Sequence, residues 1–342
     1  MIKPNAIDLF CGCGGLTLGL KKVGFNVLGA VDIDPLSIET YKANHPEVYT
    51  WEKDICKLQP NVLKRKFHLK KGDLDLLAGC PPCQGFSTIR TLNGARNIKD
   101  PRNDLLLEFQ RFVEALRPKA VMLENVPGLA RDGRFEKFLI FMKKFGYVGT
   151  PKILDAADYG VPQRRRRLIY VAGFGSEIAY AKKSKKHRTV RNAIAKLPKT
   201  GESGDLVHDI PERHNPTVLY LIRRIPKNGG SRTDLPMEDQ LDCHKRCTGF
   251  KDVYGRMAWD DVAPTLTSGC FNPSKGRFLH PEEDRAITMR EAALLQGFPR
   301  RYKFPITSNK SALASMIGNA LPPPFISRHA KRVLKHLTEK YT

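Results

Sequence analysis

Short apolar runs alternate with helix-like patterns over the first 175 residues. Apolar side chains repeat at helical spacing over residues 104–117, and over shorter lengths at 16–24 and 34–45. The apolar runs between them predict buried strands at 3–10 (KPNAIDLF), 26–31 (NVLGAV), 74–78 (LDLLA), 119–123 (KAVML) and 168–173 (LIYVAG). This alternation predicts an α/β fold, with a mostly parallel sheet and helices on both faces.

The pattern changes after about residue 175. Residues 176–285 are rich in Lys, Gly, Pro and Asp and predict only short, irregular strands. Helical spacing returns at 288–297 and 326–340. The chain has 342 residues, more than one ordinary core. We therefore expect one large domain, made of residues 1–175 and 286–342, and a smaller inserted domain of residues 176–285.

Composition is that of a globular protein with reduced cysteines. Hydrophobic residues make up 41% of the chain and charged residues 27%. No apolar stretch approaches the ~18 residues that a membrane span needs. The N-terminal sequence MIKPNAIDLF lacks the layout of a signal peptide, so we expect a cytoplasmic protein. The eight cysteines are then expected to be thiols, available for catalysis, metal binding or packing.

The charge is strongly basic. The formal net charge is +23, from 58 Lys and Arg against 35 Asp and Glu. The surplus is spread along the chain, with 10 in residues 1–175, 5 in 176–285 and 8 in 286–342. An excess of this size indicates a polyanionic partner, of which nucleic acid is the commonest.

Chemically unusual residues follow the predicted strands. The first strand ends in CGCGG, the second in Asp32, the strand at 74–78 in GCPPCQ and the strand at 119–123 in Glu124. In open α/β sheets, ligands bind beyond the carboxyl ends of the strands. The sequence therefore predicts a site built from these four strand ends.

The first of these segments, DLFCGCGGLTLG, suits a cofactor loop. Gly12, Gly14 and Gly15 allow a sharp turn and a close approach of the backbone to a ligand. Thr17 stands where the third glycine of a G-x-G-x-x-G signature would be, so the dinucleotide signature is incomplete. Asp32, about twenty residues later, suits a pair of ribose hydroxyls. These residues favour an adenosine-containing cofactor and leave NAD and S-adenosylmethionine both open.

The segment GCPPCQGFS allows three interpretations. Cys80 and Cys83 form a C-x-x-C pair, but a zinc site would need a second pair, and Cys243 with Cys247 is a poor candidate. A redox pair would need the cysteines to open a helix, which the double proline disfavours. The remaining chemical interpretation is one nucleophilic thiolate, held in direction by two prolines.

Two further segments carry charge at strand ends. Glu124 is followed by Asn-Val-Pro-Gly and is a candidate acid or hydrogen-bond donor. Residues 163–167 read Gln-Arg-Arg-Arg-Arg and lead into a strand, which places Arg165 and Arg167 on one face. Four arginines in a row indicate contact with phosphate or orientation of a substrate.

Taken together, these motifs resemble the bacterial-type cytosine-C5 DNA methyltransferase family from residue 7 to about 324, outside the inserted region. DLFCGCGG is similar to its cofactor loop, PPCQGFS to its nucleophile motif, ENV to its glutamate motif and QRRRR to its arginine motif. Arg290-Glu291-Ala292-Ala293 and GNALPP at 318–323 resemble its last two motifs.

The resemblance implies a Rossmann-like S-adenosylmethionine-dependent methyltransferase fold, with residues 176–285 as a target-recognition domain. It implies that the Cys83 thiolate adds to C6 of a flipped-out cytosine, that Glu124 binds N3 and the exocyclic amine, and that Arg165 and Arg167 orient the base. The cofactor positions that it implies are Phe10, Gly12, Gly14, Asp32, Ile33, Asp54, Ile55, Leu105 and Asn319. Asp32 replaces a common Glu, and Ile33 an aromatic residue found in some members.

The resemblance also implies partners. They are S-adenosylmethionine, with no metal, and double-stranded DNA, with a monomeric enzyme at the bacterial chromosome and a restriction endonuclease as a functional partner. Two alternatives stay open: a tRNA cytosine methyltransferase, disfavoured by Gly85-Phe86-Ser87, and a catalytically silent DNA-binding protein, disfavoured by the presence of Cys83 and Glu124.

Overall fold

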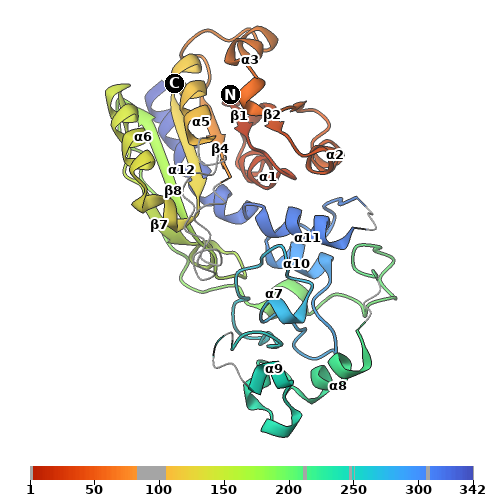
Figure 1. Cartoon of the computed structure of the whole chain (residues 1–342). Helices are drawn as coiled ribbons and strands as arrows, with labels where there is room; N and C mark the ends of the chain where they lie inside the picture. The colour runs from red at the N-terminus through yellow and green to blue at the C-terminus, as the bar shows by residue number, and fades with distance from the viewer. Residues whose placement is uncertain are drawn as a thin grey trace. The chain divides into compact units, whose positions relative to one another are not determined.

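The computed structural model describes residues 3–82, 105–210, 214–245, 249, 251–305 and 309–341. Its contacts divide the chain into two compact units (Figure 1). The first consists of residues 1–159, 166–183 and 321–342, and the second of residues 160–165 and 184–320. The predicted helix at 288–297 therefore belongs to the second unit, whereas the expected large domain included it.

The first unit is built on one mixed sheet. In the described residues eight strands follow the order β3-β2-β1-β4-β5-β8-β6, with β7 also paired to β8. Strands β3, β2, β1, β4 and β5 run parallel, while β8 is antiparallel to β5, β6 and β7. The bounds are β1 Asn5–Leu9, β2 Asn26–Asp32, β3 Tyr49–Glu52, β4 Leu76–Gly79, β5 Ala120–Asn125, β6 Tyr147–Val148, β7 Lys152–Asp155 and β8 Arg166–Phe174.

The central strands are apolar because both faces of the sheet are covered. Every residue of β4 and β5 is buried. On one face, Phe109 and Phe112 of α5 and Phe138 of α6 pack with Leu9 and Leu123 of the sheet. The helices are α1 Gly15–Lys22, α2 Pro35–Asn44, α3 Pro60–Lys66, α5 Leu105–Leu116, α6 Gly133–Lys144 and α12 Pro323–Tyr341, with 3-10 turns η1 Ile55–Lys57, η4 Pro127–Arg131 and η5 Ala156–Tyr159.

Helices α1 and α12 pack closely together although they are about 300 residues apart in sequence. A Cβ on Gly19 of α1 would lie 2.6 Å from the side chain of Ile326 of α12, so only glycine permits this approach. The Ser327 hydroxyl of α12 donates a hydrogen bond to the Gly19 carbonyl at 3.1 Å. The C-terminal helix is therefore an integral part of the first unit.

The second unit consists mainly of short helices and loops. Its helices are α7 Val190–Ile194, α8 Pro216–Arg224, α9 Asp242–Lys245, α10 Met289–Leu295 and α11 Lys310–Asn319, with 3-10 turns η6 Arg232–Asp234, η7 Met237–Asp239 and η8 Pro273–Lys275. In its described residues strand pairing is limited to isolated bridges, such as Arg256 with Leu279. This agrees with the irregular pattern of residues 176–285.

One buried arginine connects several of these loops. The Arg256 guanidinium is fully buried and donates to the carbonyls of Ile222 and Ile225 at the end of α8, at 2.8 and 3.1 Å. It also donates to the carbonyl of His280 at 3.0 Å and to the carboxylate of Asp284 at 2.6 Å. Because a buried charge is costly unless it is paired, Arg256 fixes α8 against the loop that precedes α10.

Within the described residues, no helix is long and apolar enough to cross a membrane.

Candidate active site

Four parallel strands end at one edge of the sheet in the first unit. Strand β1 leads into Phe10, β2 ends at Asp32, β4 leads into Cys80, and β5 ends at Glu124 and Asn125. Strands β1 and β4 are neighbours although β2 follows β1 in the chain, so the strand order reverses between them. A reversal of this kind opens a crevice at the carboxyl ends of the two strands.

The turn after β1 has a backbone that requires unusual residues. Phe10, Gly12 and Gly14 have φ angles of 62°, 50° and 91°, in the left-handed region that favours glycine. The Gly12 N–H donates to a carboxylate oxygen of Asp32 at 2.7 Å, which ties this turn to the end of β2. A Cβ on Gly12 would meet no atom within 4 Å, so the turn leaves open space beside it.

Asp32, the last residue of β2, and Ile33, which follows it, have groups available to contact a ligand. The second carboxylate oxygen of Asp32 accepts the N–H of Asp34 at 3.0 Å, which leaves further lone pairs on both oxygens. Burial raises the pKa of Asp32, although the N–H donors of Asp34 and Gly12 partly offset this effect. The Ile33 side chain is 66% exposed, an unusual position for a large apolar residue unless a ligand covers it.

The other predicted cofactor residues of this unit lie on η1 and α5. A carboxylate oxygen of Asp54 caps η1 by accepting the Cys56 N–H at 2.9 Å. Ile55 is buried in the core, and the Arg111 guanidinium of α5 donates to its carbonyl at 2.8 Å. Leu105 is half-buried at the first position of α5. The glycine turn leaves room for a ligand, the carboxylates can accept hydrogen bonds, and the exposed isoleucine offers an apolar surface. This combination fits an adenosine group.

Glu124 is held by an arginine of the neighbouring strand. Its carboxylate lies 2.8 Å from Nε of Arg167, and both side chains are largely buried. The Asn125 side-chain amide donates to the carbonyl of Pro81 at 2.9 Å, which joins the end of β5 to the loop after β4. Sequence reasoning identified Glu124 and Arg167 separately and placed Asn125 at the same strand end without giving it a role.

The C-x-x-C segment is described only in part. Cys83 lies outside the described residues, as does Cys247 of the alternative zinc pair. Cys80 is partly buried, and its pKa is raised well above the usual value, first by burial and then by the negative charges of Glu124 and Asp8. Cys80 is therefore a protonated thiol at neutral pH. Among the described residues, no cluster of three or more His, Cys, Asp or Glu side chains could hold a metal ion.

Asp8 of β1 is a second buried acid near this edge that sequence reasoning missed. It is fully buried, the Thr17 hydroxyl donates to its Oδ2 at 2.7 Å, and its Oδ1 has no hydrogen-bond partner in the described part of the chain. Burial raises its pKa to about 7, with a smaller contribution from the charge of Asp32. Its position inside an apolar strand gave no signal of this.

The predicted alternation along the arginine segment is confirmed by burial, since Arg165 is buried and Arg167 half-buried while Arg164 and Arg166 are exposed. However, Arg165 belongs to the second unit. Its guanidinium donates to the carbonyls of Leu266 and Gly318 at 3.0 and 2.8 Å. Asn319, the last predicted cofactor residue, follows Gly318 and is exposed at the end of α11.

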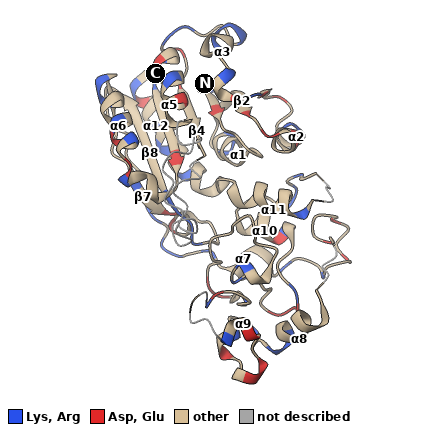
Figure 2. Cartoon of the chain, in the orientation of Figure 1, with Lys and Arg blue, Asp and Glu red and all other residues tan. Residues whose placement is uncertain are grey.

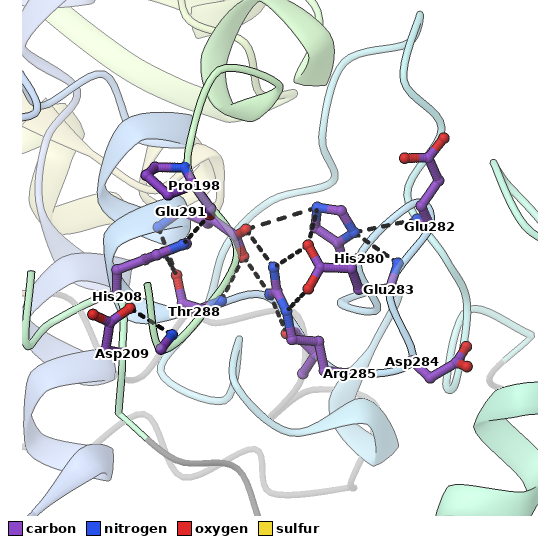
Figure 3. Close-up of polar contacts among 12 residues, drawn as sticks. Pro198, His208, Asp209, His280, Glu282, Glu283, Asp284, Arg285, Thr288 and Glu291 are labelled. Atoms are coloured by element: carbon purple, nitrogen blue, oxygen red, sulfur yellow. Dashed lines mark hydrogen bonds and ion pairs between the residues drawn. The ribbon is translucent and has the colours of Figure 1, made fainter. Parts of the chain in front are cut away.

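The segment Arg290–Ala293 lies in the first turns of α10, and Thr288 and Glu291 at the start of this helix belong to a polar network (Figure 3). Thr288 caps the helix in a reciprocal capping box with Glu291, and His208 hydrogen-bonds to the Thr288 hydroxyl at 2.8 Å. The two Glu291 oxygens each accept from Arg285 at 2.8 Å. Arg285 also contacts Glu283 at 2.9 Å. This network is saturated by its own members and stabilises the start of α10.

The family model of C-5 cytosine-specific DNA methylases matches residues 5–335. The chain belongs to this family. It is a DNA cytosine-5 methyltransferase, and S-adenosylmethionine is the methyl donor of the family. The predicted fold and activity are thereby confirmed.

Individual relatives agree along the whole chain. The type II methylase M.HgiDII of Herpetosiphon aurantiacus is 36% identical over 98% of this chain and 97% of its own length. The type II methyltransferase M1.HphI of Haemophilus parahaemolyticus is 34% identical over 98% of this chain and 87% of its own length. Among solved structures, a DNA modification methyltransferase encoded within an E. coli prophage aligns with a TM-score of 0.75 and 26% identity, covering 99% of this chain and all of its own.

Proposed function

We propose that Cys83 is the nucleophile of this methyltransferase and that Glu124 binds the target cytosine. The observation that carries the proposal is the Glu124 carboxylate at the end of β5, held by Arg167 at 2.8 Å. Asn125 connects the same strand end to Pro81, two residues before Cys83. Cys80, the other cysteine of the pair, is held as a protonated thiol, which supports Cys83 as the thiolate.

The residues then act on a cytosine that has left the helix. A thiol cannot reach C6 of a stacked base, so the base is flipped out at a cost of a few kcal/mol. The Cys83 thiolate forms a bond to C6, while Glu124, as a protonated carboxyl group, donates to N3 and accepts from the exocyclic amine. This stabilises the electron-rich C5 that results. Bound S-adenosylmethionine supplies the electrophilic methyl group that C5 takes. Loss of the C5 proton and breakage of the bond between sulfur and C6 restore the thiolate.

The cofactor is assigned to the crevice between β1 and β4. Asp32 accepts from the ribose hydroxyls, exposed Ile33 packs on the adenine, and Asp54 accepts from the adenine amine. The glycine turn at Gly12 leaves space for the backbone to approach the ligand. Phe10, Gly14, Ile55, Leu105 and Asn319 complete the set of proposed cofactor residues.

Arg165 has a different role from Arg167 in this proposal. Arg167 contacts Glu124 directly and orients its carboxylate. Arg165 donates to the Gly318 carbonyl, next to Asn319, and to Leu266. It therefore fixes the backbone at Leu266 and Gly318 within the second unit, in addition to its proposed role of orienting the base.

Residues 176–285 are proposed to recognise the DNA target, and residues 1–175 with 286–342 to carry catalysis. Basic residues end α3 and α6 in one unit and α8 in the other, whereas acidic residues gather around η7 and α9 (Figure 2). Charge distributed in this way supports binding of the duplex backbone by both units. The affinity for DNA should then fall steeply as the salt concentration rises.

The relatives' names extend the proposal to the biological setting. Because they are type II methylases, we assign this enzyme to a restriction-modification system in the bacterial cytoplasm, with a restriction endonuclease as its functional partner. We also assign it a monomeric state, because one copy of the chain carries every residue named above. Size-exclusion chromatography with light scattering tests the last point.

The decisive experiment compares two serine variants of the C-x-x-C pair. We expect Cys83→Ser to lower methylation of a DNA duplex by roughly 1,000-fold or more, because a hydroxyl is far less ionised than a thiol at neutral pH. Cys80→Ser is the matched control and should keep most of the activity. Wild-type enzyme should also form a covalent adduct with 5-fluorocytosine DNA in mass spectrometry, since fluorine cannot leave as the proton does. Near-normal turnover by Cys83→Ser would contradict the assignment.

A further inference from the structure

Cys80 lies at the start of the loop that leads to the proposed nucleophile, beside the proposed base-binding carboxylate. Strands β4 and β5 are parallel neighbours, with Gly79 paired to Leu123, and Cys80 and Glu124 are the residues that follow this last pair. The Cys80 N–H donates to the Leu9 carbonyl at 3.3 Å, and the carbonyl of the following Pro81 accepts from Asn125 at 2.9 Å. The backbone of Cys80 is therefore tied to the strands on both sides.

The Cys80 side chain contacts the Glu124 carboxylate. The two groups share a side-chain hydrogen bond, and burial together with the charges of Glu124 and Asp8 raises the pKa of the thiol well above its usual value. Because this hydrogen bond raises the pKa of the thiol, it favours the protonated thiol, which is therefore the donor. Arg167 approaches the same carboxylate from β8, with Nε 2.8 Å from Oε1.

We propose that Cys80 is a positioning residue for Glu124: its thiol and the Arg167 guanidinium together fix the direction in which the carboxyl group meets the cytosine. The inference deepens the proposed function and depends on the assigned role of Glu124. A carboxylate held by one partner can still rotate about its last bond, and a second partner from another strand restricts that rotation. The loss of a buried hydrogen bond is large enough to have a measurable effect here.

The structure also gives the two cysteines of the C-x-x-C pair different tasks. Cys80 must stay protonated to donate, and its buried, negatively charged surroundings ensure this. Cys83 must ionise to attack. Cys80→Ser keeps a donor at nearly the same place, whereas Cys80→Ala removes the donor and changes little else.

The test measures single-turnover methylation of a duplex with saturating S-adenosylmethionine and DNA. We expect Cys80→Ala to lower the rate about tenfold and Cys80→Ser to stay within about threefold of wild type. Dissociation constants for S-adenosylmethionine and DNA should change less than twofold in both, which separates positioning from loss of folding. Equal rates for the alanine and serine variants would overturn the proposal.

A double-mutant cycle separates this inference from the proposed function. If Cys80 acts through Glu124, Cys80→Ala should have little further effect on 5-fluorocytosine adduct formation in a Glu124→Gln background. Independent, multiplying effects would overturn the inference. Full activity of Glu124→Gln alone would refute the assigned role of Glu124, whereas an inactive Glu124→Gln with an unaffected Cys80→Ala would refute only the role of Cys80.

Discussion

Buried charged groups of the two units differ in how many hydrogen-bond partners they have. In the first unit, Asp32 keeps unused lone pairs, Glu124 is held by Arg167 and Cys80, and Asp8 has one oxygen without a partner in the described part of the chain. In the second unit, Arg256 and Glu291 are surrounded by several partners each. In these examples, the groups with spare hydrogen-bonding capacity lie at the strand ends of the proposed site, while the saturated groups stabilise the second unit.

The largest test of this comparison is removal of a saturated group. We expect Glu291→Ala to lower the free energy of unfolding by roughly 4 kcal/mol, because it removes the bidentate partner of Arg285 and opens the capping box of α10. Urea unfolding measures the effect. Glu283→Ala is the matched control; its side chain is 37% exposed, and the cost should stay near 1 kcal/mol. An equal loss of free energy of unfolding in the two variants would contradict the difference between saturated and exposed groups.

The next test removes an unsatisfied group. Burial raises the pKa of Asp8 to about 7, so the folded state keeps its proton more tightly than the unfolded state. The free energy of unfolding therefore falls as the pH rises from about 4 to about 7, and Asp8→Asn abolishes this contribution. The free energy of unfolding of the variant, relative to that of wild type, should rise by about 3 kcal/mol between pH 5 and pH 8. A gain that does not depend on pH would show that Asp8 is not the group responsible.

The smallest test concerns the exposed apolar side chain at the cofactor crevice. Ile33→Ala should raise the dissociation constant for S-adenosylmethionine about fivefold, by loss of apolar contact worth roughly 1 kcal/mol. Isothermal titration calorimetry measures this directly. Ile140 on α6 is the matched control, since it is 62% exposed against 66% for Ile33. If Ile140→Ala weakens binding as much, Ile33 has no special place at the cofactor.

Much of the first unit was predictable because its central strands are buried on both faces. Continuous apolar runs identified β1, β2, β4, β5 and β8, and the residues after them gave Asp32 and Glu124. Strands β3, β6 and β7 were missed because four, two and four residues carry too little periodicity. The place of residues 286–320 in the second unit depends on long-range contacts, such as Arg165 with Gly318, that no local pattern encodes.

The hydrogen-bond partners of the site residues could not be predicted from the sequence either. The sequence places Glu124 and Arg167 at the ends of separate strands, but their pairing depends on β8 running antiparallel to β5. The contact between Cys80 and Glu124 depends on the register of β4 and β5. Sequence motifs thus identified the reacting groups, while the groups that orient them became visible only in three dimensions.

The close contact between Gly19 and Ile326 has a consequence for synthesis of the protein on the ribosome. Helix α1 is made early, but its partner α12 emerges only after some 300 further residues have been translated. Until then, the apolar surface of α1 that faces α12 has no native cover, so the nascent first unit depends on chaperones or on temporary contacts. Methylation of DNA by a new molecule therefore cannot begin before α12 has been translated.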